Sequence, residues 1–187
     1  VLKKHLTEKF FNSMDTDGSG TLDTGEIQVM LEHEFNKLGV KYKTFREPGG
    51  TELSEKIRAI LLDKENIELI STAESLLFAA ARAQLTAEQI KPAIEKGEFV
   101  ICDRFTDSTI AYQGYGRGLD IKQLEEINYI ATDGLTPDIT FILDISPEVA
   151  AVRMEAEASD RMEETGVDFF RMIRGGYRQI KDQNPNR

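Results

Sequence analysis

Short apolar segments that alternate with helix-like segments constrain the fold of this chain more than any other feature. The sequence predicts three strands, at 40–45 (VKYKTF), 99–105 (FVICDRF) and 137–146 (PDITFILDIS). Apolar residues at helical spacing predict helices over about 52–62, 72–96, 120–134, 147–157 and 167–182. Because strands and helices alternate along the chain, we expect an α/β domain with a mainly parallel sheet.

Length, charge and cysteine content limit the classes of protein to consider. The 187 residues suffice for one good core, and a net charge of −10 argues against nucleic acid or an anionic membrane as a partner. The single cysteine, Cys102, excludes an internal disulfide and fits a reducing compartment, and its apolar neighbours favour a packing role. No apolar run approaches the ~20 residues that span a bilayer, and residues 1–11 lack the apolar core of a signal peptide. We therefore expect a cytoplasmic protein.

The first 38 residues predict a helix, a loop and a second helix. Apolar stripes mark helices over 2–14 and 26–38, and the second helix should end at Gly39. The loop between them fits a twelve-residue calcium-binding template with Gly20 at its sharp turn. The oxygen ligands would be Asp15, Asp17, Ser19, Thr21, Asp23 and Glu26.

This segment resembles an EF-hand over about residues 2–38. The alternative is an Asp- and Gly-rich turn, or a helix start that merely contains carboxylates. The number of matching positions and the flanking helices favour Ca²⁺ binding. EF-hands usually occur in pairs, and the sequence contains no second loop of this kind. Two alternatives follow: the single loop binds Ca²⁺ weakly, or a second molecule supplies the partner hand in a homodimer.

Charged residues follow two of the predicted strands directly. Arg46 and Arg104 stand at the carboxyl ends of strands, which is where open α/β sheets bind ligands. Two guanidinium groups that converge there suit a phosphate, because each can donate two parallel hydrogen bonds. Glu47 and Asp103 lie beside these arginines.

Five sequence motifs carry a second resemblance. They are TFREPGG, ESLLFAAARAQ, CDRF, STIAYQGYGRGL and TDGLTPDITFILDI, in this order along the chain. Over about residues 27–187 the chain resembles thymidylate kinase. The resemblance implies a P-loop-kinase-like parallel sheet and a dTMP-like nucleotide as ligand.

The resemblance also implies roles for individual residues. The dTMP phosphate would be held by Arg46 and Arg104, with Glu47 and Asp103 orienting the arginines and an Mg²⁺–phosphate assembly. The nucleoside pocket would be formed by Phe78, Arg82, Ser108, Tyr112 and Gln113, where Phe78 stacks on thymine and Arg82 bonds its carbonyl edge. The alternatives are structural roles without a ligand: Phe78 would be a core residue, Arg82 a surface residue and Tyr112 a packing residue.

A connector at 153–163 would be the lid that closes over ATP. Arg153 and Arg161 match positions that are basic in the family, and the resemblance implies catalytic roles for them together with Asp103 and Arg104. Between them lies MEAEAS, which is acidic where some bacterial members carry further arginines. This departure weakens the case for catalysis, since lid arginines stabilise charge on the transferring phosphoryl group.

The motif G-x-x-x-x-G-K-[S/T], which cradles the phosphates of ATP, does not occur in the 187 residues. We therefore expect an EF-hand (1–38) that replaces the first strand and phosphate loop of a thymidylate kinase-like domain (39–187), with helix 26–38 shared. The chain also stops before the family's last strand and terminal helix. A sheet short of two strands should close up, borrow a strand from another chain or fold imperfectly.

Three hypotheses about function follow. The favoured one is a calcium-binding hybrid that retains a dTMP pocket but has lost phosphoryl transfer, because the acidic loop would repel a triphosphate. The alternative is an active dTMP kinase that uses ATP and Mg²⁺ and is regulated by Ca²⁺. The third is a structural module in which both sites are vestigial.

Overall fold

The computed structural model describes residues 24–149, 161 and 166–187. The predicted first helix, most of the calcium loop and most of the predicted helix 147–157 lie outside these residues. Residues 147–149 are helical, as expected for the start of that helix.

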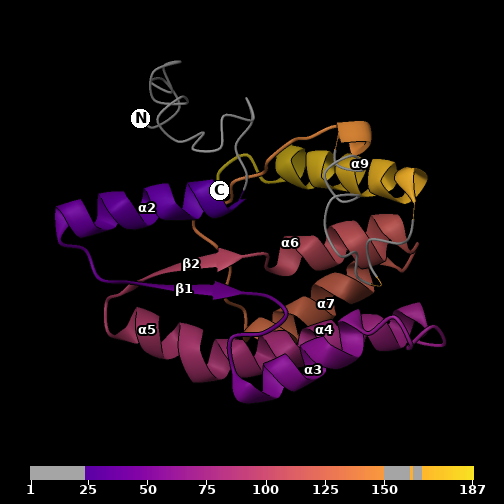
Figure 1. Ribbon diagram of the computed structural model, residues 1–187, viewed down its shortest axis with the longest axis horizontal. Coiled ribbons are helices and arrows are strands. Elements are labelled where there is room, and N and C mark those ends of the chain that lie inside the picture. Colours follow the sequence, from indigo (N-terminus) through magenta and orange to yellow (C-terminus); the bar gives the residue numbers. More distant parts are fainter. Residues whose placement is uncertain (1–23, 150–160, 162–165) are drawn as a thin grey trace.

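A two-stranded parallel sheet forms the centre of the described chain (Figure 1). Strand β1 (Tyr42–Arg46) pairs with β2 (Phe99–Asp103), so that Tyr42 lies opposite Phe99 and Arg46 lies opposite Asp103. The parallel direction was predicted and is confirmed. It requires a long crossover connection between the strands, which the helices from residue 52 to residue 95 provide.

Helices cover both faces of this sheet. Helix α2 (Thr24–Leu38) lies on one face, where the ring of Phe35 is 5.1 Å from that of Phe99 and 5.6 Å from that of Tyr42. On the other face lie α4 (Ser71–Leu85) and α5 (Lys91–Glu95) (Figure 1). The end of α2 agrees with the sequence, since Gly39 follows with a positive φ of 67°.

Helix α3 (Glu52–Leu62) packs against α4. The side chain of Thr51 caps α3 by accepting a hydrogen bond from the backbone of Ser54 at 3.1 Å. The hydroxyl of Ser54 donates in turn to the carbonyl of Ala81 on α4 at 2.9 Å. Because Ser54 and Ala81 are small, the two helix backbones can lie close together.

The predicted helix 72–96 is one continuous helical run with a change of winding. A π-helical segment, η2 (Thr86–Ile90), stands between α4 and α5. A second helical run after β2 was not predicted, namely α6 (Thr106–Thr109) followed by π-helical η3 (Ile110–Gly116). Gly114 and Gly116 weaken the helix signal of this run, so only its packing reveals it.

The main apolar cluster lies between η3, α7 (Ile121–Thr132) and α9 (Val167–Gln183). Both α7 and α9 were predicted and are confirmed. Gly176 lets α9 lie close to η3, because a Cβ atom at position 176 would lie 2.6 Å from the ring of Tyr115 on η3. The buried members of this cluster are Ile110, Ala111, Leu124, Phe169, Ile173 and Ile180.

The prediction of a third strand over 137–146 is wrong. Within the described residues this segment has neither strand nor helix structure. Its side chains at Ile139 and Phe141 are 62% and 61% exposed, as expected for a strand-like sequence without a neighbour to pair with. A strand forms only where another backbone accepts and donates its hydrogen bonds, and composition alone cannot supply that partner.

Among the described helices, none is both long enough and apolar enough to cross a bilayer.

Candidate functional site

The carboxyl ends of the two strands bring four of the predicted site residues together. Arg46 and Asp103 are paired in the sheet, and the backbone N–H of Glu47 donates to the carbonyl of Asp103 at 2.9 Å. Arg104 follows with a φ of 66°, a left-handed conformation that is uncommon for a residue with a side chain. Strained positions of this kind concentrate at functional sites, so the geometry agrees with a ligand site here.

A tight turn after β1 fixes the side chain of Arg46. Arg46 donates to the carboxylate of Glu55 at 3.1 Å and to the carbonyl of Pro48 at 3.2 Å, and Arg58 donates to the same carbonyl at 3.0 Å. Glycine suits position 49, because its φ of 141° is a backbone conformation that residues with a side chain rarely adopt. The pKa of Glu55 is lowered, chiefly because the backbone N–H of Gly50 donates to it.

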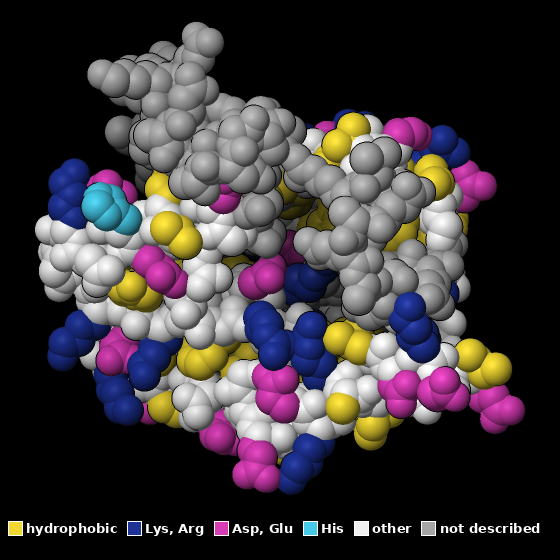
Figure 2. Space-filling view, viewed as in Figure 1, with side chains coloured by type: hydrophobic (Ala, Val, Ile, Leu, Met, Phe, Trp, Pro, Cys, Tyr) yellow, Lys and Arg dark blue, Asp and Glu magenta, His cyan; other side chains and the backbone are white. Residues whose placement is uncertain are grey.

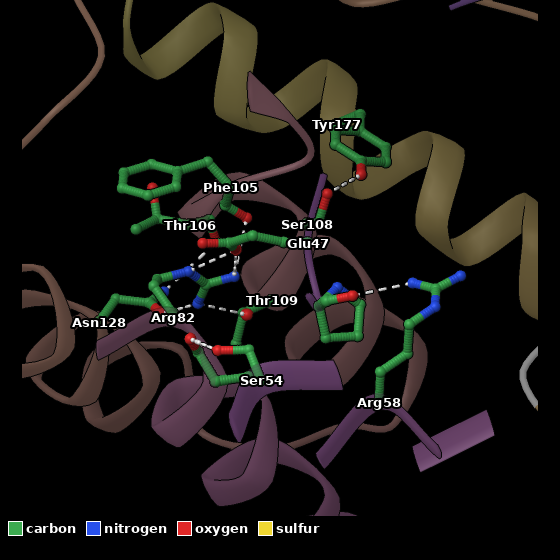
Figure 3. Close-up of polar contacts among 12 residues, drawn as sticks. Glu47, Ser54, Arg58, Arg82, Phe105, Thr106, Ser108, Thr109, Asn128 and Tyr177 are labelled. Atoms are coloured by element: carbon green, nitrogen blue, oxygen red, sulfur yellow. Dashed lines mark hydrogen bonds and ion pairs between the residues drawn. The ribbon is translucent and has the colours of Figure 1, made fainter. Parts of the chain in front are cut away.

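Arg82 is the centre of a buried polar network (Figure 3). Its guanidinium group, on a residue only 1% exposed, contacts a carboxylate oxygen of Glu47 at 2.6 and 2.8 Å. The other N–H groups donate to Thr109 at 2.9 Å, to Asn128 at 2.7 Å and to the carbonyl of Phe105 at 3.1 Å. All five N–H groups of Arg82 therefore have protein acceptors, which fixes the plane of the guanidinium.

Glu47 is the only charged partner of Arg82 among these groups. One of its oxygens accepts from Arg82, whereas the other, Oε1, is buried without a hydrogen-bond partner among the described residues. Burial raises the pKa of Glu47, and the charge and hydrogen bonds of Arg82 oppose this rise. Removing Arg82 would thus leave a carboxylate that the interior does not tolerate.

Tyrosine side chains surround the second arginine of the site. The guanidinium of Arg104 lies 5.1 Å from the ring centre of Tyr112, within the range of a cation–π interaction. Nearby, the hydroxyls of Ser108 and Tyr177 lie 2.8 Å apart (Figure 3). Tyr177 lies on α9, so this hydrogen bond links α9 to Ser108, three positions after the CDRF motif.

Two other predicted residues lie on or beside α4. Phe78 stands on α4 between Glu74 and Arg82, one helical turn from each. Gln113 is buried on η3 and donates to Glu74 at 2.9 Å. Arg161, for which the resemblance implies a catalytic role in the lid, contacts Glu74 at 2.7 Å and the carbonyl of Leu61 at 2.9 Å in this structure.

The remaining predicted residues lie outside the described part of the chain. These are Arg153 and five of the six expected calcium ligands, namely Asp15, Asp17, Ser19, Thr21 and Asp23. Glu26, the last expected ligand, lies in the first turn of α2. Within residues 24–149, 161 and 166–187, no three His, Cys, Asp or Glu side chains are grouped so that they could hold a metal ion.

Figure 2 shows a hollow near the middle of one face of the molecule, with basic and acidic side chains gathered beside it. A site with two arginines at strand ends and an aromatic ring on a neighbouring helix can bind a phosphate and stack on a planar base.

Several residues of the site were not predicted from the sequence. Thr109 and Asn128 hold Arg82, and Arg58 lies beside Arg46 at the turn. Asn128 carries no local signal, because it comes from α7, forty-six positions beyond Arg82. Glu74 could have been found, since it precedes Phe78 by four residues and therefore shares its helix face.

Comparisons with known proteins agree with this geometry. The family model "Thymidylate kinase" matches residues 23–187. The thymidylate kinase of Desulforudis audaxviator is 43% identical over 90% of this chain and 76% of its own length. That of Chlorobaculum tepidum is 46% identical over 95% of this chain and 85% of its own. The crystal structure of thymidylate kinase from Ehrlichia chaffeensis matches with a TM-score of 0.68 and 37% identity, over 86% of this chain and 74% of that one.

These relatives correct the hypothesis favoured from the sequence. A calcium-binding hybrid that has lost phosphoryl transfer was expected, and that expectation is wrong. Relatives that share 43% and 47% identity with most of this chain are named thymidylate kinase, and nothing in the comparisons indicates an EF-hand fusion. The match over most of the chain outweighs the absence of the phosphate-loop lysine. The fold is that of an α/β thymidylate kinase with a parallel sheet, and the chain belongs to the thymidylate kinase family.

Proposed function

We propose that this protein is a dTMP kinase, which transfers the γ-phosphoryl group of ATP to dTMP and yields ADP and dTDP. The observation that supports this most is the position of Arg46, Asp103 and Arg104 at the neighbouring carboxyl ends of the paired strands. The names of the relatives support the same activity.

The two arginines would bind the phosphate of dTMP. Arg46 is already oriented by Glu55 and Pro48, and Arg104 by the ring of Tyr112, so little side-chain entropy remains to be lost on binding. Catalysis of phosphoryl transfer depends mainly on positioning and on stabilising charge, and pre-oriented guanidinium groups serve both.

The base would stack on Phe78. Arg82, one turn further along α4, would lie at the adjoining edge of the base. Its N–H groups all contact protein acceptors in this structure, so it would have to exchange one of these contacts to bond a carbonyl oxygen of the base. Thr109 is held against Arg82 and would form part of the same wall.

Mg²⁺ fits the carboxylate at the end of β2. This ion is usually bound through one or two carboxylates together with phosphate oxygens and water, and Asp103 supplies one carboxylate beside Arg104. When bound, Mg²⁺ neutralises charge on the phosphates. Asp103 would hold the ion, and Arg46 and Arg104 would hold the phosphate next to it.

Turnover of the complete chain tests this proposal. In an assay that couples ADP release to NADH oxidation, we expect dTMP-dependent turnover with ATP and Mg²⁺, on the order of 1–100 s⁻¹ as is typical of kinases. A matched reaction with thymidine in place of dTMP serves as the control. ADP release that does not depend on dTMP would contradict the proposal.

Calcium binding by residues 15–26, and with it the division of the chain at residue 38, stays a prediction from the sequence. Calorimetric titration should give one Ca²⁺ per chain, and Glu26→Gln should abolish binding because it removes the bidentate carboxylate. Turnover measured with Ca²⁺ and with a chelator then tests whether the ion regulates the kinase. No heat of Ca²⁺ binding in the wild type would refute the calcium site without affecting the kinase proposal.

A further inference from the structure

A buried cluster around Glu74 lies one helical turn before Phe78. Glu74 is 1% exposed and accepts hydrogen bonds from the amide Nε2 of Gln113 at 2.9 Å and from Arg161 at 2.7 Å. Arg117 contacts both of its oxygens at 3.4 Å. Because Glu74, Phe78 and Arg82 follow at four-residue spacing, the cluster lies on the same face of α4 as the base-stacking ring.

The chemistry of this cluster determines which way the amide of Gln113 points. A carboxylate can only accept hydrogen bonds, so the amide must turn its NH₂ group toward Glu74. The carbonyl oxygen of the same amide then points away from Glu74. Gln113 is itself buried, so the orientation cannot be exchanged freely through contact with water.

We propose that Glu74 is a positioning residue that sets the choice of nucleobase. It fixes the amide of Gln113 so that a hydrogen-bond acceptor faces the nucleotide, and an acceptor selects a pyrimidine with a ring N–H. Thymine carries that N–H at N3, whereas cytosine has an acceptor at N3 and would be repelled. This inference rests on the proposed function, because it takes the ligand to be a thymine nucleotide.

Replacing the carboxylate by an amide should reverse this orientation. In Glu74→Gln only one oxygen remains, and Arg161, which makes the shortest contact, would retain it. The new NH₂ group would then face the NH₂ of Gln113, and two donors cannot share a hydrogen bond. Gln113 should turn over, which brings its own NH₂ group to the nucleotide.

The experiment measures binding of two nucleotides that differ only at this edge of the base, dTMP and 5-methyl-dCMP. Calorimetry should show that the wild type prefers dTMP and that Glu74→Gln lowers the ratio of the two affinities about tenfold, the size of one hydrogen bond. Arg82 keeps the same contacts in both proteins, so a change in the ratio reports Gln113. A merely structural defect would weaken both ligands alike and leave the ratio unchanged.

Two further variants complete the design. Glu88→Gln is the matched control, because Glu88 accepts from the amide of Gln84 at 2.9 Å on the exposed side of the helix, and its ratio should equal that of the wild type. Gln113→Leu leaves Glu74 and both arginines in place and removes the acceptor, so it should lose the preference even if Glu74→Gln does not fold.

The outcomes separate this inference from the proposed function. A wild type that binds neither nucleotide would overturn the proposed function. A wild type that prefers dTMP, with a Glu74→Gln or Gln113→Leu variant that keeps the same ratio, would overturn the role of Glu74 alone.

Discussion

Replacing Arg82 by methionine should lower the free energy of unfolding by about 3–5 kcal/mol, the usual cost of breaking a buried ion pair from one side. The variant keeps the length of the side chain but leaves Glu47 buried without its counter-ion. It also leaves Thr109, Asn128 and the carbonyl of Phe105 without their donor. Chemical denaturation should detect the loss of free energy, and thermal unfolding should show a fall in melting temperature on the order of 10 °C.

The pH dependence of this loss follows from Glu47. Burial raises its pKa in the folded state, and Arg82 opposes the rise, so the pKa should be higher still in Arg82→Met. A carboxyl whose pKa is raised by folding contributes its stability below the unfolded pKa and loses it as the pH rises toward the folded pKa. The deficit of the variant should therefore be smaller at pH 5 than at pH 8.

Two comparisons make this prediction specific. Arg171→Met removes an exposed arginine that pairs with Glu148 and Asp168, and it should cost at most about 1 kcal/mol. A double variant, Glu47→Leu with Arg82→Met, should recover part of the stability because no charge is then left buried. Equal losses in Arg82→Met and Arg171→Met would show that the buried network does not stabilise the fold.

The contacts of Arg82 also show where prediction from the sequence ended. Because Arg82 follows Phe78 by four residues, the sequence predicts that both lie on one face of a helix. Both residues lie on α4. The side chains that accept from Arg82 come from three separate segments: Glu47 follows β1, Thr109 ends α6 and Asn128 lies on α7. The chain brings these segments together only on folding. Local periodicity reports the face of one helix, and it carries no information about which distant side chains that face meets.

The prediction of strands from the sequence has the same limit: a local pattern does not report which distant segment pairs with it. The two segments that pair with each other became β1 and β2, with the arginines at the expected ends. Residues 137–146 have an equally strand-like composition and remain irregular. What separates them is a hydrogen-bonding neighbour, which is a property of the assembled sheet and not of the segment itself.

Arg104→Ala should lower kcat/KM for dTMP by about 10²–10³-fold, the effect of removing one donor to charge that develops in a transition state. Stability should change little, since Arg104 is an exposed residue whose guanidinium lies against the ring of Tyr112. Arg104→Lys should restore part of the activity, because lysine keeps the charge but not the paired donors. Arg178→Ala, which removes an exposed arginine of α9, is the matched control.

The test that assigns this effect to the phosphate compares dTMP with thymidine. If Arg104 binds the phosphate, its removal weakens dTMP binding by roughly tenfold or more and leaves thymidine binding unchanged, because thymidine has no phosphate for it to hold. If both ligands weaken equally, Arg104 acts through the position of Tyr112, 5.1 Å away, and the phosphate must be bound by other groups. The two results require different descriptions of the site, since the first makes the strand end a phosphate site and the second makes it a support for the nucleoside pocket.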